Sequence, residues 1–273
     1  MENLTKQSLV EKHIISPEFA SSDDENCAIL INDEENICIM INEEDHLRMQ
    51  LFGEGIAIEE LMNLAIEIDQ KLERLVDYAF SEKYGYLTAC PTNVGTGLRV
   101  SVMVHLPGLA ETGNLNKILH IVNNFGMSVR GVYGEGSQSM GNMYQISNNQ
   151  TLGLTEQEIV KNMKLITDKI IEQERVARKY LGKNQIGLAD KVYRAFGILE
   201  NARILSSNEC IDLLSDVKLG TDMGIISELD DTKIKKLFLY TKPANLQKYY
   251  GKVMDSNERD LKRTDIIRKI VTE

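Results

Sequence analysis

The sequence contains no tryptophan, and it has only four cysteines and four histidines among 273 residues. The cysteines are Cys27, Cys38, Cys90 and Cys210; none of them forms a CxxC pair, and no HExxH occurs. This scatter argues against a disulfide framework and against a zinc site. We therefore expect reduced thiols and no metal bound directly by the protein.

Long apolar runs are also missing. A typical apolar stretch, residues 100–104, is far too short to cross a bilayer. Residues 1–6 lack the basic and then apolar pattern of a signal peptide. These absences predict a cytoplasmic protein that has no contact with membranes.

Basic residues are in the minority. The chain has 31 Lys and Arg against 41 Asp and Glu, a formal net charge of -10. Such a surface repels nucleic acid and favours cationic partners. With 42% hydrophobic residues the chain can bury one sizeable core and a second, smaller one.

The apolar pattern predicts an α+β fold, an antiparallel sheet flanked by helices, followed by a helical C-terminal domain. Expected strands are 27–31, 37–41, 99–106, 127–132 and 143–146, and expected helices are 57–80, 114–125 and 155–180. After Gly182 strand signals nearly vanish, and helices are expected at 187–204, 208–219, 231–239, 243–250 and 257–271. We therefore predict two domains, 1–182 and 183–273.

Three short segments carry residues suited to chemistry. Residues 42–48, NEEDHLR, place three acids, a histidine and Arg48 directly after an apolar strand. Composition alone favours a solvated turn. The alternative is a binding site in which the acids bind a cation and the arginine binds an anion. Residues 90–99, CPTNVGTGLR, form a glycine-rich turn that can expose backbone N–H groups to an anion. Cys90 is either a reactive thiol beside a cation or an inert buried cysteine.

The third segment is residues 130–136, RGVYGEG. Glycines flank Arg130 and Glu135, so the backbone can present both charges to one pocket. Glycine-rich turns are common, and this segment indicates little when it is considered alone.

Taken together and in this order, the three segments resemble the ATP:guanido phosphotransferase family, the phosphagen kinases. CPTNVGT matches the family signature around its reactive cysteine. Residues 9–17 (LVEKHIISP), 84–88 (YGYLT) and 134–137 (GEGS) are most similar to the bacterial protein-arginine kinase branch.

The resemblance implies a site for ATP, with Mg²⁺ bound through the nucleotide phosphates. Arginine offers a bidentate fork for phosphate oxygens. The implied nucleotide-binding residues are His13, Arg48, Arg99, Val100, Ser101, Val102, Met103, Arg130, Gly131, Val132, Tyr133, Gly134 and Glu135.

The resemblance also implies an acceptor site. A guanidinium is a poor nucleophile because its pKa is above ~12, so it must be oriented and deprotonated. Glu44 and Glu135 match the two glutamates of the family that do this. Cys90 matches the signature cysteine, to which we assign a positioning and electrostatic role.

Near the C-terminus, residues 259–264 (RDLKRT) resemble the RDxxRA motif of protein-arginine kinases, with Thr264 in place of alanine. The resemblance implies a phosphoarginine pocket formed by Arg259, Asp260 and Arg263, in a domain that also mediates dimerisation. The alternative is a solvated helix face of mixed charge, which such strings usually form.

The implied activity is ATP-dependent phosphorylation of arginine side chains in proteins. Implied partners are protein substrates with exposed arginine, an activator protein, a stress-gene repressor, a Clp unfoldase-protease and a second copy of the chain. A small-molecule guanidino kinase and a non-catalytic phosphoarginine-binding module are the alternatives. The family's upstream SSRxRxARN motif has no counterpart in residues 1–17. We therefore expect this chain alone to bind ATP weakly and to phosphorylate slowly or not at all.

Overall fold

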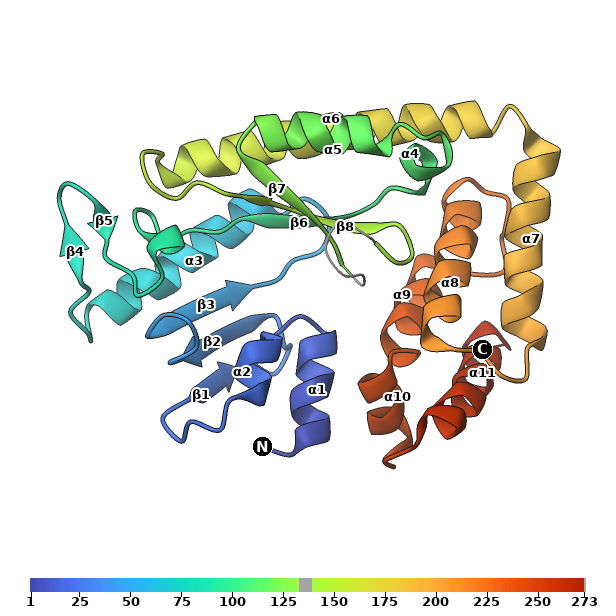
Figure 1. Cartoon of the computed structure of the whole chain (residues 1–273), viewed down its shortest axis with the longest axis horizontal. Coiled ribbons are helices and arrows are strands. Elements are labelled where there is room, and N and C mark those ends of the chain that lie inside the picture. Colours follow the sequence, from blue (N-terminus) through green and yellow to red (C-terminus); the bar gives the residue numbers. More distant parts are fainter. Residues whose placement is uncertain (133–138, 273) are drawn as a thin grey trace.

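Two small antiparallel sheets and a bundle of helices make up the computed structural model, which describes residues 1–132 and 139–272 (Figure 1). The first sheet has the order β1-β2-β3 and the second β6-β8-β7, and a β4–β5 hairpin stands apart. The strands are β1 (Ala28–Ile31), β2 (Ile37–Ile41), β3 (Leu47–Leu51), β4 (Phe80–Ser81), β5 (Gly85–Tyr86), β6 (Ser101–His105), β7 (Met127–Gly131) and β8 (Met143–Asn148). The predicted α+β class is confirmed.

The first sheet buries one face against the N-terminal helices. Cys38 and Met40 of β2 are fully buried, and they pack with Leu9 of α1 (Asn3–Glu11) and with residues 14–15. A short helix, α2 (Pro17–Ser21), follows; the Ser16 hydroxyl caps it by accepting the Phe19 N–H at 3.0 Å.

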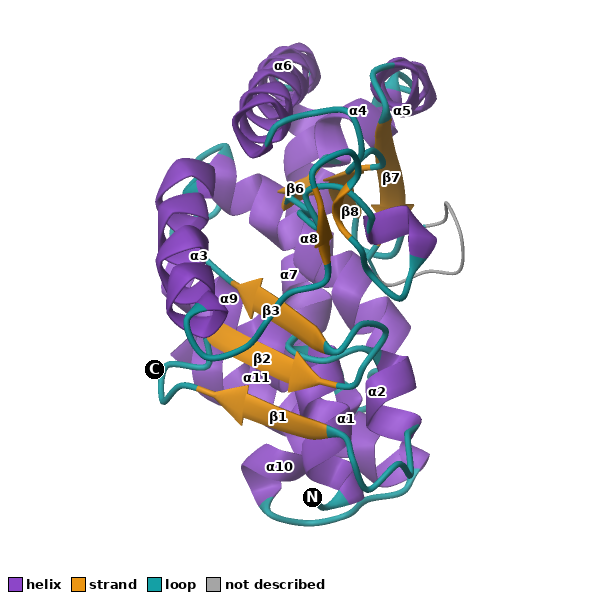
Figure 2. Cartoon of the chain, turned by 90° about the vertical axis from the view of Figure 1, so that its left-hand side faces the viewer, coloured by secondary structure: helices purple, strands orange, loops and turns teal. Residues whose placement is uncertain are grey.

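The second sheet is covered on one face by α5 (Leu115–Asn124) and α6 (Glu156–Leu181). Ile146 of β8 and Met163 of α6 are completely buried in this core. Thr155 and Glu158 form a capping box at the start of α6. Helix α3 (Ile58–Glu73) packs against β3 and α6, so it connects the two sheets, which Figure 2 shows one above the other.

Five helices form the C-terminal part around a core of their own: α7 (Gln185–Asn201), α8 (Ser207–Asp222), α9 (Asp231–Tyr240), α10 (Pro243–Tyr250) and α11 (Ser256–Thr272). Val192, Leu214 and Ile267 are fully buried in it. In the two described ranges, no helix is long and apolar enough to span a membrane.

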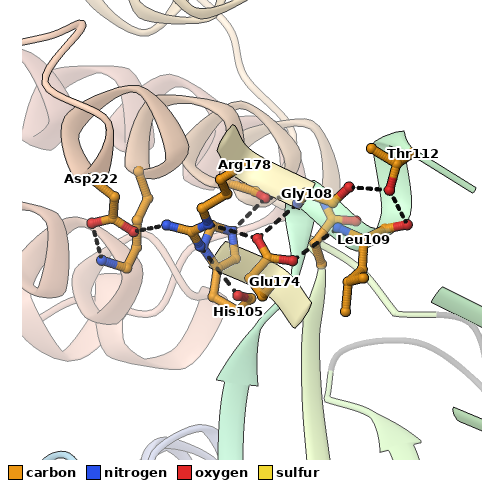
Figure 3. A network of polar contacts seen from close by, with 10 residues as sticks. His105, Gly108, Leu109, Thr112, Glu174, Arg178 and Asp222 are labelled. Carbon is orange, nitrogen blue, oxygen red and sulfur yellow. Dashed lines mark hydrogen bonds and ion pairs between the residues drawn. The ribbon is translucent and has the colours of Figure 1, made fainter. Parts of the chain in front are cut away.

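A buried polar network links the second sheet to these helices (Figure 3). Glu174 of α6 accepts the backbone N–H groups of residues 108–109 at 2.8 and 2.9 Å, at the start of α4 (Pro107–Glu111), and Arg178 Nε at 2.6 Å. Arg178 also donates to Asp222 of α8 at 2.8 Å and to the His105 carbonyl at 3.3 Å. The carboxylate therefore has three donors, which compensates for its burial.

Several element boundaries differ from the sequence prediction. The helix expected over 57–80 ends at Glu73, and the following residues form the β4–β5 hairpin. Leu75, which continues the apolar spacing, is 80% exposed, so that spacing does not reflect burial. Strand β3 and helices α1, α2 and α4 are additions to the predicted elements. The helix expected over 208–219 continues to Asp222, and Gly224 then takes a left-handed φ of 70°.

Candidate active site

The Glu44 turn joins β2 to β3. Asn42 opens it with a φ of 54°, and its N–H donates to the His46 carbonyl at 3.0 Å. Arg48 then pairs with Met40 across the sheet. Glu44 is exposed at the tip, which leaves its carboxylate accessible to a ligand.

Glu43 is the acid of this segment that turns inward. Its carboxylate accepts Ser16 Oγ at 2.6 Å, Arg48 Nη1 at 2.9 Å and the Glu44 N–H at 2.8 Å. Burial raises the pKa of Glu43, but these hydrogen bonds and the Arg48 charge outweigh it and hold the pKa below its usual value. Glu43 therefore fixes Arg48 and ties the turn to the segment that follows α1.

Asp45 brings the Glu44 turn to the cysteine loop. Its Oδ1 accepts the Cys90 backbone N–H at 3.0 Å, and its Oδ2 accepts Asn93 Nδ2 at 2.8 Å. These bonds span 45 and 48 positions of sequence, so they are specific to the folded chain. The turn that carries Glu44 is thereby attached to the loop that carries Cys90.

The cysteine loop is fixed from its other side by Thr151. The Thr151 hydroxyl lies 2.9 Å from the Thr92 carbonyl and 2.8 Å from the Val94 carbonyl, and its own carbonyl accepts the Thr96 N–H at 2.9 Å. Gly95, at a φ of 114°, lies so close that an added Cβ would come within 2.2 Å of the Thr151 carbonyl oxygen. Glycine is therefore required here for the loop to pack.

The Cys90 side chain is half-buried, and its Sγ lies 3.0 Å from Thr92 Oγ1. The Cys90 carbonyl accepts the Thr88 hydroxyl at 2.7 Å. Main-chain and side-chain contacts thus set the direction of the thiol, which suits the positioning role predicted for it.

The second sheet presents a polar face with two of the predicted arginines. Met103 and Arg130 both pair with Gln145, so all three side chains are on one face, and strand alternation adds Ser101. Arg99 lies two residues before β6, where the alternation of exposed and half-buried residues continues. Arg99 and Arg130 are exposed. A face with two exposed guanidinium groups suits an anionic ligand.

Val100 and Val102 lie on the opposite face, where they pack against the core under α6. Their side chains therefore cannot reach a ligand on the Arg99 face, and only their backbone groups can take part in nucleotide binding. Gly131 ends β7, and the Val132 N–H donates to the Met143 carbonyl at 3.1 Å. The predicted residues Tyr133, Gly134 and Glu135 lie outside the described residues.

His13 is placed at the junction between α1 and α10, beside Lys242. Burial, and then the Lys242 charge, lower the pKa of His13 to about 4, so the imidazole is neutral at pH 7. Glu11 holds the same junction by accepting the backbone N–H groups of residues 244–245 at 2.7 and 2.8 Å. The following segment is tied through Ser16 to Glu43, the partner of Arg48.

The predicted phosphoarginine residues differ in exposure. Arg263 is 1% exposed; its guanidinium donates to the carbonyls of Thr241 and Leu205 at 2.8 and 2.5 Å, and to Asp260 at 2.6 Å. Arg259 and Asp260 are half-buried on the same helix. The Arg263 charge is therefore used inside the fold, where it orients Asp260.

Comparison with known proteins shows the family of the chain. Residues 1–177 match the ATP:guanido phosphotransferase C-terminal catalytic domain, and residues 185–273 match the protein-arginine kinase McsB C-terminal domain. The protein-arginine kinase of Halothermothrix orenii is 52% identical over 269 residues, which cover 98% of this chain and 77% of that protein. That of Bacillus subtilis is 47% identical over 97% of this chain and 73% of its own length. The chain belongs to the protein-arginine kinase family.

Solved structures of guanidino kinases share its fold. The duplicated taurocyamine kinase of Schistosoma mansoni, with bound transition-state-analogue components, superposes with a TM-score of 0.57 at 25% identity, covering 86% of this chain and 32% of that one. A lombricine kinase gives 0.52 at 29% identity, with 64% and 51% covered. These protein-arginine kinase sequences and phosphagen kinase folds agree with the resemblance inferred from the three motifs.

Four residues that hold the candidate site together are missing from the sequence prediction: Glu43, Asp45, Asn93 and Thr151. The first two stand within NEEDHLR, where the prediction names Glu44 as the catalytic acid, and Asn93 stands within the signature loop. Thr151 has no sequence signal, because its role depends on the packing of a distant segment against Gly95.

Proposed function

We propose that this protein transfers the γ-phosphoryl group of ATP to arginine side chains of proteins. The observation that carries the proposal is the Asp45 carboxylate, which bonds to the Cys90 N–H and to Asn93 and so joins the acidic turn to the signature loop. Membership of the protein-arginine kinase family supports the same reaction.

In the proposed reaction, a terminal nitrogen of the acceptor guanidinium attacks the γ-phosphorus in line. A P–N bond forms as the bond between that phosphorus and the β,γ-bridging oxygen breaks, and ADP leaves with the electron pair. The proton lost by the guanidinium passes to a carboxylate. Among the residues that the structure describes, the exposed Glu44 is the candidate for this base. Cys90 orients the guanidinium beside it.

We assign ATP to the polar face of the β6-β8-β7 sheet. Arg99 and Arg130 are exposed there, and phosphoryl transfer depends chiefly on positioning and on cations over the phosphate oxygens. Arg48, which Glu43 holds at 2.9 Å, adds a third guanidinium from the other sheet. Mg²⁺, held through the nucleotide, would supply positive charge that offsets the negative charge developing during transfer.

We further propose that residues 183–273 form a separate domain that binds phosphoarginine through Arg259 and Asp260. Arginine suits the phosphate and aspartate suits the guanidinium. The domain's own buried core supports this division. Family membership also supports cytoplasmic protein substrates with exposed arginine, an activator protein, a Clp unfoldase-protease and a second copy of the chain as partners.

The reaction is tested by incubating the protein with ATP and a basic protein, and then detecting phosphoarginine by mass spectrometry and phosphorus NMR. We expect a P–N product that is absent when Glu44→Gln replaces the unaltered protein. Product on serine or threonine, or equal product from Glu44→Gln, would count against the proposal. Free arginine as a second acceptor distinguishes a small-molecule guanidino kinase, which would prefer it.

A further inference from the structure

The β4–β5 hairpin lies at the edge of the molecule (Figure 1), and it exposes apolar side chains. Phe80 is 59% exposed, Tyr84 46% and Leu87 48%. Leu75, just before the hairpin, is 80% exposed. Single exposed apolar residues are ordinary, but several on one short hairpin form a surface suited to binding another chain.

This hairpin is attached directly to the cysteine loop. The Tyr86 N–H donates to the Gly95 carbonyl at 2.8 Å, and the Gly95 N–H donates to the Tyr86 carbonyl at 3.2 Å. A Cβ added at Gly85 would lie 2.4 Å from the Gly95 carbonyl oxygen, so the two segments are in close contact. Leu87 precedes Cys90 by three residues. The exposed apolar surface therefore continues from the loop that holds the proposed acceptor guanidinium.

An acidic side chain lies at the base of the hairpin. Asp69 accepts the Tyr78 hydroxyl at 3.0 Å, and the Tyr78 ring packs edge to face on Tyr86 with centroids 5.7 Å apart. Burial raises the pKa of Tyr86, and the charges of Asp69, Glu73 and Glu156 raise it further. The rings of Phe80 and Tyr86 pack edge to face with centroids 5.3 Å apart. Carboxylates attract a guanidinium, and aromatic faces stack on it. The surface therefore combines acidic and aromatic groups that complement an arginine-bearing segment.

We propose that Phe80, Tyr84 and Leu87 bind the polypeptide that flanks the acceptor arginine in an extended, locally unfolded segment of a protein substrate. Arginine would enter beside Cys90 while an apolar neighbour in the same segment covers the exposed hairpin side chains. This inference rests on the proposed kinase function and adds a substrate class to it. A free guanidino compound carries no flanking chain and would not use this surface.

The test compares two acceptors in the full chain. One is a twelve-residue unstructured peptide with a central arginine between leucine and phenylalanine, and the other is N-acetyl-arginine-amide. The variant carries Phe80→Ser, Tyr84→Ser and Leu87→Ser. We expect kcat/KM for the peptide to fall about tenfold, which corresponds to about 1.4 kcal/mol, while the value for the small acceptor stays unchanged. A matched control replaces Val176, Tyr180 and Ile186, which are comparably exposed on α6 and α7, by serine.

A second measurement uses the unaltered protein, so it does not depend on how the variant folds. A peptide whose leucine and phenylalanine are replaced by serine should have a kcat/KM about tenfold lower than the apolar peptide. Equal values for the two peptides, or equal loss in the control variant, would overturn the docking proposal alone. If the unaltered protein phosphorylates none of these acceptors, the kinase proposal itself is overturned.

Discussion

Replacing Asp45 tests the contact that joins the two halves of the proposed acceptor site. Its carboxylate accepts the Cys90 N–H at 3.0 Å and Asn93 Nδ2 at 2.8 Å, and the residue is only half-buried. Asp45→Ala removes both bonds. A buried hydrogen bond to a charged group contributes about 1.5–3 kcal/mol to the free energy of unfolding. Because Asp45 is half-buried, water can partly replace its two hydrogen bonds in the variant. We expect a loss of about 2 kcal/mol in the free energy of unfolding, which lowers Tm by about 4–8 °C.

The expected effect on catalysis is larger than the effect on stability. Without the bridge, the Cys90 loop is free to move relative to Glu44, and a displacement of 1 Å can reduce the rate about 100-fold. We therefore expect Asp45→Ala to lower kcat about 100-fold at 25 °C, where the variant is still folded. Phosphoarginine formation on a basic protein, measured with saturating ATP, gives the rate, and thermal unfolding gives Tm.

Asp45→Asn separates geometry from charge. Its side-chain oxygen can still accept the Cys90 N–H, and its amide can donate to Asn93 once that side chain turns over. We expect it to keep kcat within about tenfold of the unaltered protein. Asp24→Ala is a matched control, because Asp24 also accepts a backbone N–H and an asparagine amide, both from Asn26 at 2.9 Å, on the exposed surface. Equal kcat in Asp45→Ala and the control would refute the role given to the bridge.

Three further outcomes follow from the same structure. Arg99→Ala and Arg130→Ala should each raise KM for ATP about tenfold or more without changing Tm by more than about 2 °C, because both side chains are exposed; an unchanged KM would place the nucleotide elsewhere. Arg263→Ala should lower the free energy of unfolding by about 3 kcal/mol, because it leaves Asp260 and two carbonyls without their hydrogen-bond donor. Arg259→Ala should instead weaken phosphoarginine binding, measured by calorimetry, and leave Tm nearly unchanged. Burial, and then the Arg178 and Lys218 charges, lower the pKa of His105 to about 3 from an ordinary 6.5. Between these two values the unfolded chain binds more protons than the folded chain, so the free energy of unfolding decreases as pH falls below about 6.5. Urea unfolding at pH 7 and 4.5 should show His105 contributing about 2 kcal/mol to that loss, and His105→Asn should remove this part; an identical pH dependence would contradict it.

The sequence predicts those parts of the fold whose signals are local. The Thr155 capping box and the apolar spacing behind it predict α6 to within a residue or two. The helix end at Glu73 escapes prediction, because Leu75 continues the apolar spacing although it is exposed. Strand β3 escapes it because its short alternation follows directly on a run of acids.

The residues of the candidate site also differ in whether a local sequence signal predicts them. The residues that we propose to contact a ligand, such as Glu44, Cys90 and Arg99, lie in motifs that resemble those of the family, so the sequence alone suggests them. Residues that position them, such as Asp45 and Thr151, act through hydrogen bonds across more than 40 residues of sequence, and only the fold creates those contacts. Arg263 shows the converse: a motif identifies it as a binding residue, but the structure assigns its charge to two backbone carbonyls and Asp260. A motif therefore specifies which side chains occur together, and burial decides which of them can face a ligand.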